Sequence, residues 1–164
     1  MKTLELAQDG QSRVVAMIFD PGDDPIDGLA KASARYGLDA AHFTGIGAFR
    51  SVTVGWFDLD AADYRRIDVS EQVEVLSLVG DITTADLDSE DPKVHAHVVL
   101  GRSDGSTVGG HLLSGRVRPT LEIIVTETSG RLRRRHDPAT GLALIDLDRS
   151  DVAMDRDAGM EVAR

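Results

Sequence analysis

Three of the five histidines lie within residues 93–115, at spacings that could hold a metal ion. His95 and His97 alternate with apolar residues, which predicts a β-strand with both histidines on the face opposite the apolar one. Residues two apart on one face of a strand have α-carbons about 6.5–7 Å apart. Two imidazoles at that spacing can converge on one ion.

A turn after this strand should bring a third histidine to the first two. Residues 103–106 read Ser-Asp-Gly-Ser, a turn pattern, and His111 follows two glycines on the returning run. Three histidines that leave one coordination position open suit zinc or a similar divalent ion. Glu122 is a candidate fourth ligand, although it could equally hydrogen-bond to one of the ligands without touching the metal, or be a surface carboxylate.

A His-x-His pair is also the centre of the cupin metal motif. In that motif a glutamate follows within a few residues, and a second motif supplies the last histidine. The residues after His97 are Val-Val-Leu-Gly-Arg-Ser, without a glutamate, so the cupin interpretation is weak. Another interpretation gives all three histidines only structural roles in their strands, and the sequence leaves it open.

Size and composition restrict the class of protein. The chain has 164 residues, which suits one domain with a sizeable core. The absence of cysteine excludes disulfides and thiolate metal sites and fits the reducing cytoplasm. No signal peptide, transmembrane helix or membrane partner is expected, because no apolar run is long enough. The net charge of −10 disfavours DNA as a partner, and the basic residues 131–135 are expected to be a solvated segment.

The patterns predict one main helix and about seven strands. Asp24 is a suitable N-cap before Pro25, and Gly37 suits a left-handed C-terminal position, which predicts a helix over residues 25–36. Short runs of β-forming residues follow, so we expect an α+β fold with a largely antiparallel β-sheet. The expected divisions are a lead-in at 1–12, a single domain at 13–148 and a C-terminal tail at 149–164.

The order of these segments resembles the PPC domain family (plant and prokaryote conserved, also called DUF296), over about residues 13–127. Its most specific part is His95-x-His97, followed by Gly101, Asp104-Gly105 and Gly109-Gly110-His111-Leu112. Further matching pieces are PGDDPIDGLAKASARYGL, FTGIGAFRSVTVGWFD, VEVLSLVGDIT and LEIIVTE. The resemblance implies the PPC-domain fold, assembly as a homotrimer, and a metal at the three histidines.

The chain departs from plant members of the family, which carry an AT-hook before the domain. The hook needs an Arg-Gly-Arg-Pro core that lies in the minor groove. Residues 115–119 read Gly-Arg-Val-Arg-Pro, with valine where glycine is needed, and lie between predicted strands. The plant interaction motif Gly-Arg-Phe-Glu-Ile-Leu matches only at Glu74, Val75 and Leu76. Plant-type contacts are therefore not expected.

These observations favour a stand-alone, cytoplasmic PPC-domain homotrimer that binds a divalent metal, zinc, through His95, His97 and His111. It would act as an interaction module or bind a small-molecule ligand. One alternative is a DNA-binding regulator, as the family label suggests, with no DNA-binding residues assigned. A further alternative is a metal-dependent enzyme that uses the open coordination position, with Glu122 or Asp104 as general acid or base. The sequence gives no independent sign of catalysis.

Overall fold

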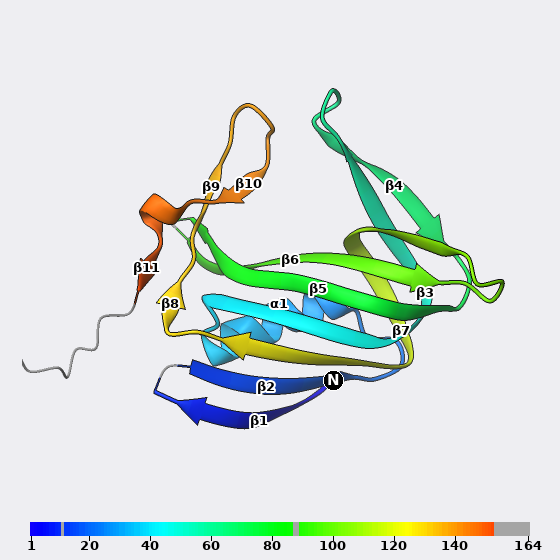
Figure 1. Ribbon diagram of the computed structural model, residues 1–164, viewed down its shortest axis with the longest axis horizontal. Coiled ribbons are helices and arrows are strands. Elements are labelled where there is room, and N and C mark those ends of the chain that lie inside the picture. Colours follow the sequence, from blue (N-terminus) through cyan, green and yellow to red (C-terminus); the bar gives the residue numbers. More distant parts are fainter. Residues whose placement is uncertain (11, 87–88, 153–164) are drawn as a thin grey trace, which may run out of the picture.

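A seven-stranded antiparallel β-sheet forms the body of the protein, with one helix beside it (Figure 1). The structure, a computed structural model, describes residues 1–10, 12–86 and 89–152. The strand order is β1-β2-β7-β6-β5-β3-β4, and β7 also pairs with β3. The elements are β1 (Lys2–Asp9), β2 (Ser12–Phe19), α1 (Pro25–Tyr36), β3 (Ala40–Asp58), β4 (Asp63–Val69), β5 (Val73–Asp86), β6 (Ser89–Gly101), β7 (Thr107–Glu127), β8 (Gly130–Arg131), β9 (Arg134–His136), β10 (Ala143–Ile145), η1 (Leu147–Arg149) and β11 (Asp151–Val152).

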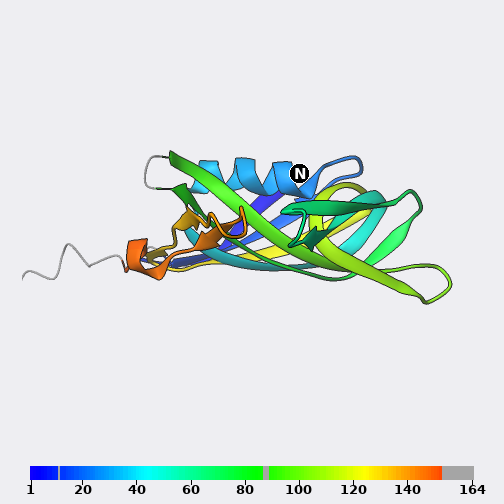
Figure 2. The same cartoon turned by 90° about the horizontal axis from the view of Figure 1, so that it is seen from above.

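Helix α1 has the bounds that the sequence predicts. The Asp24 carboxylate accepts hydrogen bonds from the backbone N–H groups of Ile26 and Asp27, and Gly37 ends the helix with φ of 65°. The buried Leu29 lies on the face that packs against β6 and β7. Figure 2 shows the helix as a separate layer along one face of the sheet. No helix among the described residues is long and apolar enough to cross a membrane.

The strands divide their side chains between a core face and an outer face. Phe19, Phe43 and Phe49 are almost completely buried and are among the largest core side chains. The backbone register places Ile124 of β7 beside Thr44 of β3, and the outer row continues through β5 to β6. This outer face is the one that carries the histidines, because their strand neighbours Ala96, Val98 and Leu100 are buried on the other side.

Two hairpins project from the same side of the sheet (Figure 1). One joins β3 to β4, and the other joins β9 to β10. The second hairpin is anchored on β5, where the backbone N–H of Thr84 donates to the carbonyl of Leu132 and Thr84 pairs with Arg133 in a parallel bridge. Tyr64 of the first hairpin stacks on His111 of β7, and Arg134 of the second donates to Asp81 of β5, which faces His95.

The structure adds elements at both ends of the chain. Residues 2–9, which the sequence analysis placed ahead of the domain, form β1 and pair with β2. Residues 151–152, in the expected tail, form β11 and pair with β8, and the rest of that tail lies outside the described residues.

Strand β7 runs through residues 115–119, which the sequence analysis placed between strands. Its pairing with β3 is irregular there, since Val117 and Leu121 pair with β3 while the residues between them do not. A proline is tolerated at such an irregularity because no ladder hydrogen bond is lost.

Candidate metal centre

The three histidines meet at the pairing of β6 with β7. His97 lies directly opposite His111 in the antiparallel register, and His95 lies two residues earlier on the same face. One ring nitrogen of each lies within 4.8 Å of those of the other two. Zinc–nitrogen bonds of about 2.0–2.1 Å place tetrahedral ligands about 3.4 Å apart, so modest rotations of the side chains would complete the arrangement. The predicted hairpin is confirmed.

The environment of the cluster favours neutral imidazoles, the form that binds metal. Burial, followed by the neighbouring His95 and His97, lowers the pKa of His111 from 6.5 to about 4. Burial, followed by His95, also lowers the pKa of His97. The Nδ1 atom of His111 is buried and has no hydrogen-bond partner within the described part of the chain. Such an unsatisfied nitrogen, together with the lowered pKa values of His97 and His111, fits a divalent cation.

Asp81 on β5 supports His95 from the neighbouring strand. The two residues are paired in the β5–β6 register, and Oδ2 of Asp81 lies 3.3 Å from Nδ1 of His95. Burial would raise the pKa of Asp81, but the hydrogen bonds with His95 and Arg134 outweigh it, and the pKa lies below its usual value. The ionised carboxylate can only accept, so Nδ1 of His95 carries the proton and its Nε2 lone pair remains available.

Tyr64 on β4 packs against the other side of the cluster. Its ring stacks on His111, with ring centroids 4.7 Å apart, and Phe57 meets Tyr64 edge-on. A glycine at position 55 makes this contact possible, because a Cβ there would lie 2.7 Å from Cδ1 of Tyr64. Gly55 is also the cross-strand partner of His111. The β3–β4 hairpin thus supplies an aromatic wall beside the histidines.

The basic segment at residues 131–135 is not the solvated surface that the sequence analysis expected. Arg134 is only 6% exposed and donates hydrogen bonds to Asp81, to Thr83 and to the carbonyl of Ala143. Arg133 is buried as well. The exposed Arg131 and Arg135 face Asp39 and Asp146. Carboxylates therefore neutralise much of this segment.

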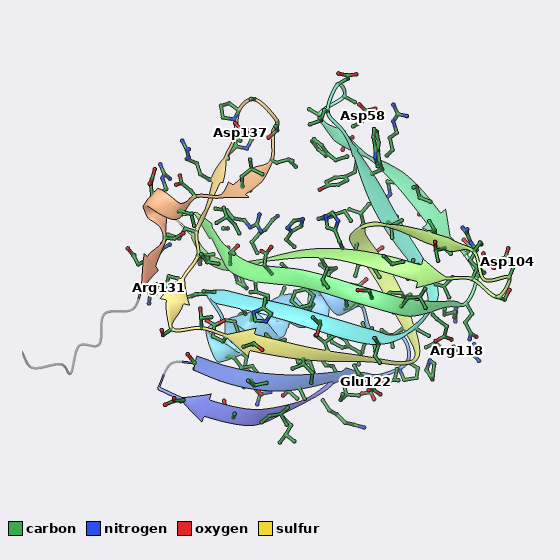
Figure 3. All side chains as sticks on the ribbon, viewed as in Figure 1. Asp58, Asp104, Arg118, Glu122, Arg131 and Asp137 are labelled. Atoms are coloured by element: carbon green, nitrogen blue, oxygen red, sulfur yellow. The ribbon has the colours of Figure 1, made fainter. Side chains whose placement is uncertain are left out.

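The two carboxylates that the sequence analysis considered beside the histidines lie elsewhere. Glu122 is eleven residues beyond His111 on β7, exposed, and paired with Ile18 of β2. Figure 3 shows it beside β2, away from the two hairpins. Asp104 lies in the β6–β7 turn, where its side chain accepts a hydrogen bond from the Ser106 N–H. Neither belongs to the cluster within one chain.

The fold agrees with what is found among known proteins. Residues 6–129 match the Plants and Prokaryotes Conserved (PCC) domain, the family called PPC above. The chain belongs to the PPC domain family. A PPC protein from Pyrococcus horikoshii is 29% identical, with a TM-score of 0.75 over 82% of this chain and 91% of its own.

Two further PPC-like structures carry descriptions that bear on function. A metal-containing protein from Archaeoglobus fulgidus is 34% identical, with a TM-score of 0.74 over 89% of this chain and 99% of its own. A protein from Bacteroides thetaiotaomicron, provisionally described as DNA-binding, is 27% identical, with a TM-score of 0.77 over 90% of this chain and 99% of its own. A curated relative, the bifunctional protein GlmU of Synechococcus sp. (strain JA-3-3Ab), is 30% identical over 135 residues, and the chain spans 20% of its length.

Proposed function

We propose that this PPC-domain protein is a cytoplasmic homotrimer that binds one divalent metal ion, zinc, per chain through His95, His97 and His111. The bound ion would make it a ligand-binding or interaction module. The observation that carries the proposal is the convergence of three imidazoles within 4.8 Å on the outer face of the sheet. The metal-containing relative from Archaeoglobus fulgidus supports it.

The residues around the histidines would prepare them for metal. Asp81 would hold His95 with Nδ1 protonated, and Tyr64 would fix the plane of the His111 ring by stacking. The depressed pKa values of His97 and His111 keep both rings neutral at neutral pH. A bound zinc ion would supply a Lewis acid with one open position for a small ligand. No general acid or base is assigned, so catalysis is not part of the proposal.

Metal content decides the proposal. Untagged wild-type protein should carry about one zinc ion per chain by mass spectrometry, as expected for a site of three protein ligands. The His95→Ala/His97→Ala double variant should carry none. His42→Ala/His136→Ala is the matched control, because it removes the other two histidines, both exposed, and should keep the ion. Equal metal content in the two double variants would refute the site.

The homotrimer is supported by the exposed apolar side chains on the outer face of the sheet. Ile46, Val79, Val99 and Ile124 are 61%, 47%, 45% and 42% exposed. Val79 lies beside His97 in the β5–β6 register, so this apolar surface is continuous with the histidine cluster. Apolar surface of this kind commonly marks an interface between proteins. Contact with further copies of the chain would bury it.

Light scattering tests the assembly. The wild type should have a mass three times the 17.6 kDa of one chain. Ile124→Glu should shift it to the mass of a single chain, because a carboxylate would be desolvated in the interface. Leu59→Glu, at the tip of the β3–β4 hairpin, should leave the trimer intact. A wild-type monomer at micromolar concentration would exclude the homotrimer.

DNA binding is the second candidate, and only the provisional description of relatives favours it. The charge of the chain opposes it, because the net charge is −10 and the densest basic segment is paired with carboxylates. Affinity for duplex DNA depends on cationic side chains that are free to neutralise phosphates. We therefore place metal binding first.

A further inference from the structure

The segment that follows β7 contains the β9–β10 hairpin and contacts Asp81, beside the histidine site, through one buried arginine, Arg134. Residues 130–152 lie beyond the part of the chain that matches the PPC family, which ends at residue 129. Among the described residues 128–151, only Arg133 and Arg134 are buried. The segment therefore adds almost nothing to the apolar core, and its buried side chains are cations.

Arg134 is held in a single orientation by the groups around it. Its Nε donates to Oγ1 of Thr83 at 2.9 Å, its Nη1 donates to the carbonyl of Ala143 at 2.8 Å, and its Nη2 donates to Oδ1 of Asp81. A buried guanidinium without partners costs free energy of folding. The side chain therefore keeps the orientation in which it makes all three hydrogen bonds. The planar fork of arginine makes this geometry specific, and lysine could not reproduce it.

Asp81 transmits that constraint to the histidines. One of its oxygens accepts from Arg134, and the other faces Nδ1 of His95. Asp81 itself is 28% exposed, so without Arg134 its carboxylate could rotate toward water. The His95 ring would then be free to rotate, and its Nε2 atom would no longer be held toward the other two histidines.

We propose that the segment after β7 is a clamp for the metal site, in which Arg134 and Asp81 are positioning residues that fix His95. The inference rests on the proposed metal binding and adds how this chain tunes its affinity. Outer partners of a metal-bound histidine commonly change metal affinity 10–100-fold when they are removed. Arg134 lies beyond the family-matched residues 6–129, whereas Asp81 lies within them.

Zinc affinity, measured by competition with a chromophoric chelator, tests the clamp. Arg134→Met and Asp81→Asn should each weaken zinc binding about 10–100-fold. The double variant should be no weaker than the weaker single one, because both residues act through His95. Arg135→Met is the matched control, since the neighbouring arginine is exposed and pairs with Asp146 within the same segment. It should bind zinc as the wild type does.

A second measurement works on the metal-free protein and does not depend on zinc. Nitrogen-15 NMR of the histidine side chains should show His95 with its proton on Nδ1 in the wild type and a shift toward Nε2 protonation in Arg134→Met. A general loss of stability would not change the tautomer of one ring in folded protein.

The outcomes separate the two proposals. Unchanged zinc affinity and an unchanged tautomer in Arg134→Met would overturn the clamp and leave metal binding intact. Absence of zinc binding by the wild type would overturn the proposed function, and the tautomer would still decide whether Arg134 orients His95.

Discussion

Acidification from pH 6.5 to about 4 should cost the metal-free protein up to about 3 kcal/mol of its free energy of unfolding. The cause is His111, whose pKa falls from 6.5 to about 4 mainly because of burial. In the unfolded chain this imidazole takes up a proton below pH 6.5, whereas in the folded protein it does so only near pH 4. The unfolded state therefore binds more protons in this window, and stability decreases as the pH falls.

The same argument fixes the limits of the effect. Above pH 6.5 both states are neutral at this residue, and below about 4 both are protonated, so the contribution is constant at either end. A shift of about 2.5 pKa units corresponds to about 3.4 kcal/mol, and because the imidazole retains some solvent contact the expected loss is discounted to at most about 3 kcal/mol. His97 contributes in the same direction, because its pKa is lowered as well.

Urea unfolding at a series of pH values, with chelator present, measures this dependence. The His111→Asn variant is the control, because it keeps a polar side chain and removes the titrating ring. Carboxylates such as Asp81 also stabilise the protein less as the pH falls, because their pKa values are lowered in the folded state. The difference between the two curves separates the contribution of His111 from theirs. Parallel curves for the two proteins would show that His111 has an ordinary pKa.

The histidine hairpin could be predicted from the sequence because its determinants are local. The alternation around His95 and His97 fixes their face, and a short turn places His111 opposite. The helix was equally predictable, since Asp24 and Gly37 define its two ends. Each of these features depends on neighbours in the chain.

The partners of the histidines could not be predicted in the same way. Asp81 reaches His95 only through the β5–β6 register, and Arg134 reaches Asp81 across 53 residues of chain. One local sign was available, since Asp81 interrupts an otherwise apolar run and a charge there requires a partner. The basic segment appeared solvated because sequence composition does not reveal that Thr83 and Asp81 would receive one of its arginines.

Glu122 illustrates a different limit of local sequence patterns. The sequence analysis placed residues 115–119 between strands and left the position of Glu122 relative to the histidines open. Strand β7 continues through an irregularity instead and carries Glu122 along the sheet to β2. The tolerance of a proline within a strand depends on the pairing of its neighbours, which the sequence does not display.

Zinc at about a thousand times its dissociation constant should raise the free energy of unfolding by about 4 kcal/mol. For a domain of this size that corresponds to an increase of roughly 10 °C in Tm. The stabilisation arises because three converging imidazoles exist only in the folded chain, where His97 and His111 are paired across two strands. Differential scanning calorimetry with and without zinc, at one protein concentration, measures it.

Matched variants decide whether this stabilisation comes from the proposed site. His97→Ala should lose nearly all of it, because two imidazoles and water bind zinc much more weakly than three. His42→Ala should retain it in full, since His42 is exposed on β3 outside the cluster. Arg134→Met should retain part of it, because a 10–100-fold weaker site still gains roughly 1–3 kcal/mol at the same zinc concentration. Equal increases in Tm for His97→Ala and the wild type would mean that zinc binds elsewhere. An increase that is full in His42→Ala, partial in Arg134→Met and nearly absent in His97→Ala would show that zinc binds at the histidines and that the clamp strengthens this binding.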